Sequence, residues 1–250
     1  MLGKLFDNIT FNSMSSKAFS KALYSAHNSE AYLEFSKRVH GTDFRQFNLL
    51  DKEQYEILIK RLELNSADKV LDLGCGLSEL SVHLSDKFGC EVTGLDFAKD
   101  YLSTLETPSK VKLIPADLNR IPTFENKFSK AVCLDSFYLL KNPSRVLDSI
   151  ANSLEKGGKF FLFYTQKTSS GILPKWLEHS SFDIEIMRFD KWNTDFWKRW
   201  NSVLEETQEQ FINEGNINLW KTKKREWDFQ GPLLENNGLI RYLFVLTKSN

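Results

Sequence analysis

Residues 69–96 read KVLDLGCGLSELSVHLSDKFGCEVTGLD, and the rest of the chain is organised around this stretch. Residues 70–73 form a short apolar run that stops at Gly74, which is typical of a buried parallel strand followed by a tight turn. Apolar residues at helical spacing follow, and then a second apolar run that ends at Asp96. The stretch therefore predicts a strand, a helix and a second parallel strand.

The turn after the first strand is suited to contact with a ligand. Gly74 and Gly76 carry no Cβ, so a ligand can approach the main chain closely there. The carboxylate of Asp96, at the end of the second strand, can accept hydrogen bonds from both hydroxyls of a ribose. Together these residues predict a nucleoside-binding βαβ unit.

Two classes of nucleoside ligand fit such a unit, the dinucleotides and S-adenosylmethionine. The dinucleotide pattern Gly-x-Gly-x-x-Gly requires a small residue where this chain has Glu79, a poor neighbour for a pyrophosphate. Asp72, just before the turn, would also repel phosphate but can help to hold an ammonium group through ordered water or backbone. The residues therefore favour an amino acid that bears an adenosine.

The motif VLDLGCG at 70–76 resembles that of the class I S-adenosylmethionine-dependent methyltransferases, of the small-molecule, methyltransferase type 11-like group. The glycine-rich loop of this family usually has one more glycine two residues beyond Gly76, where this chain has Ser78. The resemblance implies an α/β fold with a Rossmann-like, seven-stranded sheet, mostly parallel with an antiparallel C-terminal strand, plus helical caps. It also implies S-adenosyl-L-methionine as the cofactor.

The resemblance assigns roles to single residues. Asp72, Gly74 and Gly76 would line the methionine portion of the cofactor, Asp96 would bind the ribose and Phe97 would lie against the adenine face. Four aspartates lie at or near the carboxyl ends of successive predicted strands, where ligands collect in such folds. The cofactor-binding residues predicted in this way are Asp72, Gly74, Cys75, Gly76, Asp96, Phe97, Asp117, Leu118 and Asp135.

Composition limits the class of partner. Lys and Arg total 33, as do Asp and Glu, so no net charge draws the protein to nucleic acid or to an anionic membrane. Cys75, Cys90 and Cys133 fall in or beside predicted core elements, which indicates a reducing compartment. The N-terminal residues have no apolar stretch of signal-peptide length. We therefore expect a cytoplasmic protein without nucleic-acid or membrane partners, and we leave its oligomeric state open.

Three segments are expected within one structural domain: an N-terminal helical cap at 1–66, the α/β core at 67–170, and a helical lid with a closing strand at 171–250. In the core, a helix is expected over 143–154, ended by the glycine pair 157–158. In the last segment, which holds all six tryptophans, one helix is expected over 196–211.

Methyl transfer requires an aligned acceptor and sometimes a base. His40 is the first candidate base because the unperturbed pKa of histidine is near 6.5. Tyr138 is the second, and His27 and Tyr24 stay as alternatives. The residues expected to form a substrate wall or lid are Tyr24, Tyr32, Gln46 and Trp197. No metal-binding motif such as His-Glu-x-x-His occurs, so no metal is expected.

The predicted fourth strand ends in Asp135-Ser136-Phe137-Tyr138. Enzymes that methylate amino groups of nucleobases often have an Asn or Asp followed by two prolines and an aromatic residue at this place, and here both prolines are missing. The sequence thus predicts in-line methyl transfer to a small-molecule acceptor. Two alternatives stay open: a non-catalytic module that binds S-adenosylmethionine or S-adenosylhomocysteine, and an NAD(P)-dependent oxidoreductase.

Overall fold

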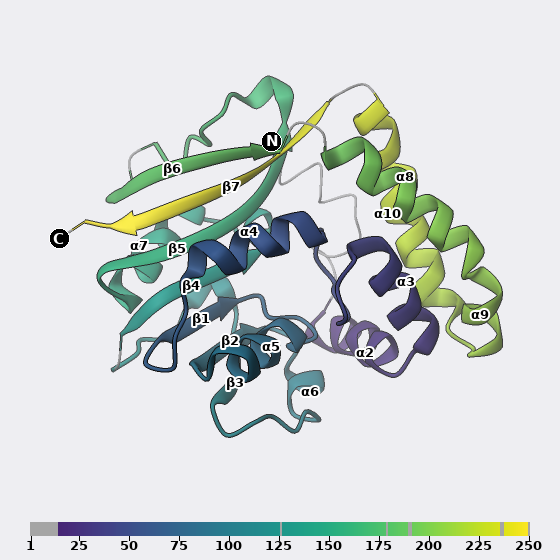
Figure 1. Cartoon of the computed structure of the whole chain (residues 1–250), viewed down its shortest axis with the longest axis horizontal. Coiled ribbons are helices and arrows are strands. Elements are labelled where there is room, and N and C mark those ends of the chain that lie inside the picture. The colour runs from purple at the N-terminus through teal and green to yellow at the C-terminus, as the bar shows by residue number, and fades with distance from the viewer. Residues whose placement is uncertain (1–14, 126, 179, 190–191, 236–237, 250) are drawn as a thin grey trace.

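The computed structural model describes residues 15–125, 127–178, 180–189, 192–235 and 238–249. The expectation about a signal peptide concerns residues 1–14 and lies outside this part. Within it, seven strands form one sheet in the order β3-β2-β1-β4-β5-β7-β6 (Figure 1). The strands are β1 (Lys69–Leu73), β2 (Glu91–Asp96), β3 (Val111–Pro115), β4 (Phe128–Leu134), β5 (Leu154–Lys167), β6 (Phe182–Phe189) and β7 (Leu239–Lys248).

The sheet is parallel from β3 to β5, and β7 runs antiparallel to both of its neighbours, β5 and β6. This confirms the predicted α/β class and the antiparallel closing strand. The short apolar runs of the central strands are buried on both faces, as parallel strands require. All five parallel strands therefore end at the same edge of the sheet.

Helices cover both faces of the sheet, because successive residues of a strand point to opposite sides. Val70 packs on the side of α4 (Lys52–Leu62) and α5 (Glu79–Phe88), while Leu71 packs on the side of α7 (Pro143–Ser153). The α7 helix begins with a proline at its first turn, and the Asn142 side chain accepts the Arg145 N–H at 3.2 Å as its N-cap. Thus the sheet lies between two helical layers.

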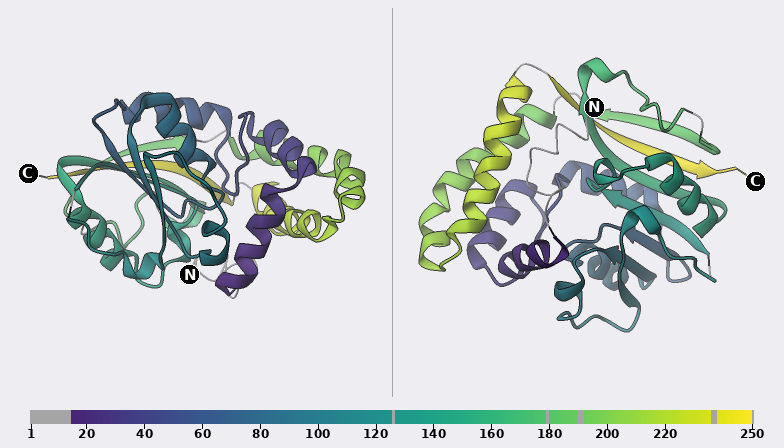
Figure 2. Two further views of the ribbon diagram at one scale, coloured as in Figure 1. Left: turned by 90° about the horizontal axis from the view of Figure 1, so that it is seen from below. Right: turned by 180° about the vertical axis from the view of Figure 1, so that it is seen from behind.

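A separate group of helices lies beyond the carboxyl ends of the parallel strands (Figures 1 and 2). It consists of α2 (Ser16–His27), α3 (Glu30–His40), α8 (Trp192–Glu206), α9 (Gln208–Asn213) and α10 (Ile217–Glu235). Ser15 and Ser29 start the first two of these helices as N-caps, because each hydroxyl accepts an N–H of the first turn. We call α2 to α4 with their loops the cap, and α8 to α10 the lid.

Two sequence predictions about helices were wrong. The expected helix over 196–211 is interrupted at Thr207, whose hydroxyl donates to the Val203 carbonyl at 2.7 Å where α8 ends. The helix expected over 143–154 is α7, but the glycine pair 157–158 lies within β5 and does not end that helix. Gly157 has a φ of 70°, and the pairing of β4 with β5 shifts at this place, so the glycines form an irregularity in the strand.

The shorter elements are α6 (Lys99–Leu102) and the 3₁₀ turns η1 (Leu118–Arg120), η2 (Phe137–Leu139) and η3 (Thr168–Ser170). Both η1 and η2 follow strands at the carboxyl edge of the sheet. Across the described part of the chain, every helix is too short or too polar to cross a lipid bilayer.

Candidate functional site

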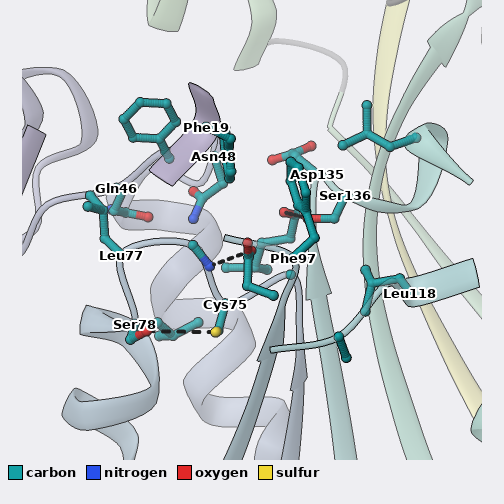
Figure 3. A pocket seen from close by; sticks show the side chains of 18 of the residues that line it. Phe19, Gln46, Asn48, Cys75, Leu77, Ser78, Phe97, Leu118, Asp135 and Ser136 are labelled. Atoms are coloured by element: carbon teal, nitrogen blue, oxygen red, sulfur yellow. Dashed lines mark hydrogen bonds between the residues drawn. The ribbon is translucent and has the colours of Figure 1, made fainter. Parts of the chain in front are cut away.

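A cavity of about 560 Å³ opens at the carboxyl edge of the sheet, between the strand ends and the cap (Figure 3). The turn after β1 and the residues after β2, β3 and β4 line its sheet side. The loop at 44–48 and Phe19 of α2 line its cap side. This volume lies in the range of cofactor and small-molecule sites.

The glycine turn holds the main chain open toward the cavity. Gly74 has a φ of 78°, and a Cβ on it would lie 2.1 Å from the Ser136 Oγ. Gly76 has a φ of 51°, and a Cβ on it would meet nothing within 4 Å. Ser78 stands where the family usually has a third glycine. It takes a left-handed φ of 64°, so the backbone keeps the conformation that glycine favours at this position. A ligand can therefore reach the main chain at Gly76.

Asp96 is fixed beside this turn. Its Oδ2 accepts the Gly76 N–H at 3.0 Å, and its Oδ1 accepts the Ala98 N–H at 2.9 Å. Burial raises the pKa of its carboxyl, and these two hydrogen bonds act in the opposite direction. Each carboxylate oxygen keeps further acceptor capacity, so the group is suited to a pair of ligand hydroxyls.

Asp72 lies beneath the turn and does not line the cavity. It is 3% exposed, and the Ser81 hydroxyl donates to its Oδ2 at 2.6 Å. Burial raises the pKa of this carboxyl to about 6. The expectation that Asp72 lines the methionine portion is therefore corrected: the side chain lies behind the lining, where it accepts the Ser81 hydroxyl.

The other predicted cofactor residues after β2 and β3 do line the cavity. Phe97 stacks on Phe19 of the cap, with ring centroids 4.8 Å apart and an interplanar angle of 11°. Asp117 is exposed. Its slight burial acts to raise the pKa of its carboxyl, but hydrogen bonds from Asn119 outweigh that effect and hold the pKa below the usual value. These residues form a flat apolar surface with a polar edge, which suits a purine.

Asp135 lines the cavity, but its carboxylate is already engaged. Arg241 donates to both of its oxygens, at 2.5 and 2.8 Å, and the Leu49 N–H donates to Oδ2 at 2.8 Å. Asp135 has a φ of 57°, a left-handed conformation that this network helps to hold. The side chain therefore shapes the wall and joins it to the cap.

His40 does not lie at the cavity, which corrects the expectation of a base at this position. It is 1% exposed, shares a 2.8 Å hydrogen bond between Nδ1 and the Leu50 carbonyl, and packs against Phe196 and Trp200. Burial lowers the pKa of its imidazole to about 3. The side chain is neutral at pH 7 and belongs to the core between cap and lid.

Three predicted wall residues lie away from the cavity lining. Tyr24 is 54% exposed on α2, and Trp197 is buried in the lid against Trp200 and Trp227. Tyr32 stands behind the lining, and its hydroxyl donates to the Gln46 carbonyl at 2.7 Å. The alternative base His27 lies 3.1 Å from the Tyr101 hydroxyl and also does not line the cavity. The amphipathic pattern of a helix shows which of its residues are apolar, but it does not show which of them face a pocket.

Gln46 and Tyr138 do line the cavity. Burial, with Asp135 and Glu226 nearby, raises the pKa of the Tyr138 hydroxyl well above its usual value. This hydroxyl is therefore protonated at neutral pH and can donate a hydrogen bond, but it cannot serve as a base.

Several lining residues were not predicted individually, among them Arg45 and Asn48. The Arg45 N–H donates to Glu79 Oε2 at 2.6 Å, and its guanidinium lies 3.4 Å from the other carboxylate oxygen. The Nε of Arg45 is buried without a partner, so it is available to an anionic group such as a carboxylate. The polar, aromatic composition of residues 41–48 was the only sequence signal for them.

Comparison with known proteins agrees with this geometry. Residues 70–158 match the family described as "Methyltransferase domain". The α/β core is therefore similar to that of the class I S-adenosylmethionine-dependent methyltransferases. The matched residues include most of β1, all of β2 to β4, the glycine turn and Asp96.

Two curated relatives and one solved structure extend the match. The chain is 26% identical to the sterol 4-C-methyltransferase strm-1 of Caenorhabditis elegans over 119 residues, 45% of this chain and 35% of that one. It is 26% identical to (S)-coclaurine N-methyltransferase of Papaver somniferum over 151 residues, 53% and 43% of the two chains. It thus spans less than half the length of either relative.

The solved structure is phosphoethanolamine N-methyltransferase 2 of Haemonchus contortus in complex with S-adenosyl-L-methionine. It aligns with a TM-score of 0.74 at 17% identity, over 95% of this chain and 60% of that one. At this identity the likeness establishes the fold, including the cap and lid that lie beyond the matched core.

Proposed function

We propose that this protein is an S-adenosylmethionine-dependent methyltransferase for a small-molecule acceptor held between the sheet edge and the cap. The observation that carries the proposal is the arrangement of Asp96 and Gly76. A buried carboxylate is held by two main-chain N–H groups beside a glycine whose side-chain direction is open to the cavity. A carboxylate with remaining acceptor capacity next to a bare main chain is what a ribose with an attached amino acid requires.

Different lining residues would contact different parts of the cofactor. Asp96 would bind the ribose hydroxyls, Phe97 the adenine face, and Asp117 with Leu118 the adenine edge. The turn at 74–76, including Cys75, would lie along the methionine portion, and the unpartnered Nε of Arg45 is suited to its carboxylate. When bound, S-adenosylmethionine supplies an electrophilic methyl group on a sulfonium.

The remaining lining residues would align the acceptor and exclude water, which is most of what an in-line displacement needs from a protein. They come from the cap and from the turn after β4: Phe19, Gln46, Phe47, Asn48, Ser136 and Tyr138. We call these six residues the acceptor wall. The Leu49 N–H donates to Asp135 Oδ2 at 2.8 Å, so a hydrogen bond joins the cap loop to the sheet side of the wall.

The relatives support methyl transfer in general and leave the acceptor open, since one is named for methylation at a sterol carbon and another for methylation at an alkaloid nitrogen. The absence of net charge supports an acceptor other than nucleic acid. The three cysteines are free and buried, which supports the reducing, cytoplasmic compartment that we propose.

Titration calorimetry with S-adenosylmethionine, S-adenosylhomocysteine and NAD tests the proposal. We expect saturable binding of the first two ligands and none of NAD, and we expect Asp96→Ala to abolish that binding. Saturable NAD binding without adenosylmethionine binding would favour the oxidoreductase alternative. Adenosylmethionine binding without transfer of labelled methyl groups to any compound of a cell extract would favour the non-catalytic module.

A further inference from the structure

Gln46 is held in place by its own main chain and by one side-chain hydrogen bond. Its N–H donates to Ser36 Oγ at 2.9 Å, and its carbonyl accepts the Tyr32 hydroxyl at 2.7 Å. Its Nε2 donates to Thr42 Oγ1 at 2.6 Å. The Thr42 hydroxyl lies 3.5 Å from the Phe44 carbonyl, to which it can donate while it accepts from Gln46 Nε2.

The fourth polar group of Gln46, its Oε1, is buried without a hydrogen-bond partner. The residue is 3% exposed and lines the cavity. Figure 3 shows its oxygen directed toward Asn48 and the interior of the cavity. A buried acceptor that lacks a partner costs free energy unless a ligand supplies the donor. The cavity is therefore prepared for a ligand that donates an N–H or O–H at this point.

The carboxylates of the cavity do not provide a free base, as far as the described residues show. Asp135 is engaged by Arg241 and Glu79 by Arg45. Asp96 accepts two main-chain N–H groups and is assigned to the ribose. Asp117 lies at the exposed edge and accepts hydrogen bonds from Asn119.

The remaining neutral ionisable groups are protonated. Burial raises the pKa of the Cys75 thiol and of the Tyr138 hydroxyl, so neither takes up a proton near neutral pH. His40 lies outside the cavity. An alcohol needs a base to become a nucleophile, whereas an amine that has given its proton to water before it binds carries a free lone pair, so the lining favours an amine.

Resting on the proposed function, we propose that the methyl acceptor is an amine and that Gln46 Oε1 accepts a hydrogen bond from its N–H. A thiol fits less well because S–H is a weak donor. The uncharged acceptor wall favours binding of the neutral amine, since burial disfavours the ammonium form. The aromatic rings of the wall, Phe19, Phe47 and Tyr138, suit an amine on an apolar scaffold.

In the transfer step the nitrogen lone pair forms the bond to the methyl carbon, and the carbon–sulfur bond breaks with its electron pair going to sulfur. The positive charge moves from sulfur to nitrogen. The N–H that faces Gln46 becomes more polar as this charge develops, so the hydrogen bond to Oε1 strengthens in the transition state. The proton stays on the product nitrogen and is lost to water after release.

The experiment compares Gln46→Leu with Thr42→Val. Both variants lose the 2.6 Å hydrogen bond between these two side chains, but only the first loses Oε1. The small-molecule fraction of a cell extract and a defined pair, 2-phenylethylamine and 4-ethylphenol, are incubated with deuteromethyl-labelled donor, and mass spectrometry locates the label. Calorimetry measures binding of S-adenosylhomocysteine, and then of 2-phenylethylamine to that complex.

We expect the label on nitrogen, about a hundredfold lower turnover for Gln46→Leu and less than about threefold for Thr42→Val. We also expect S-adenosylhomocysteine to bind both variants as it binds the wild type. Label on oxygen, carbon or sulfur alone overturns the amine proposal and leaves the methyltransferase intact. Loss of S-adenosylhomocysteine binding in Gln46→Leu makes the residue a cofactor ligand, which also overturns it. No labelled product from a protein that binds the donor overturns both proposals.

Discussion

Asp135 and Arg241 form a buried, two-pronged ion pair, with N–O distances of 2.5 and 2.8 Å, although 106 positions separate them in the chain. The guanidinium also donates to Gln54 Oε1 of the cap at 2.7 Å and to Thr165 Oγ1 of β5 at 3.0 Å. One arginine on β7 thus joins the cap, two strands and the cavity wall.

Arg241→Gln should strongly destabilise the protein, by about 3–5 kcal/mol, because it leaves the Asp135 carboxylate buried and unpaired. The measurement is urea unfolding followed by circular dichroism. The control is Arg61→Gln, which breaks the exposed 2.6 Å pair with Glu185 and should cost about 0–1 kcal/mol. Equal losses of unfolding free energy in the two variants would contradict the claim that the buried pair with Asp135 stabilises the fold more than an exposed pair does.

Gly74→Ala should weaken S-adenosylhomocysteine binding by more than about tenfold, since the new Cβ would overlap the Ser136 Oγ at 2.1 Å. Gly215→Ala is the control because Gly215 has a similar φ of 71° but open space around its Cβ direction. It should lose about 1–2 kcal/mol of folding stability from the left-handed conformation and keep its affinity. Calorimetry and urea unfolding separate these effects, and unchanged affinity in Gly74→Ala would count against the rigid turn.

Asp96→Asn should lower the affinity for S-adenosylhomocysteine by about a hundredfold, because one charged acceptor for ligand hydroxyls becomes a neutral amide. Asp117→Asn should lower it by less than about tenfold, since this carboxylate is exposed to water. Calorimetry at pH 7 measures both. A larger effect at Asp117 would mean that the ribose lies elsewhere.

Asp72→Asn should stabilise the ligand-free protein at pH 7 by about 3 kcal/mol, the equivalent of a carboxyl pKa raised from 3.8 to about 6. Above pH 6 the buried carboxylate is ionised and its full cost is present; below pH 4 it is protonated in both folded and unfolded chains. The advantage of the variant should therefore shrink as pH falls from 6 to 4. Unfolding free energies at pH 7, 5 and 4 give the trend, and an advantage that grows toward pH 4 would contradict it.

Lys223 and Glu226 of α10 form a buried pair, with the ammonium 3.2 Å from both carboxylate oxygens and 3.9 Å from the centroid of the Phe47 ring. Lys223→Met should cost about 3–5 kcal/mol, and adding Glu226→Leu should recover much of that loss. Lys224→Met, which breaks the more exposed pair with Asp228 on the same helix, should cost less than about 1 kcal/mol. A double variant whose loss equals the sum of the single losses would show that the two charges act independently.

The sequence predicted those parts of the site that depend on neighbouring residues. The run at 70–76 and Asp96 belong to one strand–turn–helix–strand unit, so local patterns determine where they lie relative to one another. The sheet followed from the alternation of strands and helices. The closing antiparallel strand followed from the family resemblance.

The sequence could not predict which face of a helix lines the cavity. His40 and Trp197 have the residue types of a pocket wall, but their environment is set by cap and lid helices that meet only in the folded chain. The Asp135–Arg241 pair likewise depends on strand neighbours far apart in sequence. The glycines at 157–158 are typical of a helix end, but in the folded chain they lie in β5, where its pairing with β4 is irregular.

The position of β7 between β5 and β6 bears on how the chain is synthesised. During translation β5 and β6 leave the ribosome before their shared partner, and each then presents an unpaired edge that can recruit another molecule. A nascent chain would also lack the guanidinium that secures the cavity wall. We expect a polypeptide stopped before residue 239 to aggregate and to depend on chaperones, whereas the longer chain can close both edges at once.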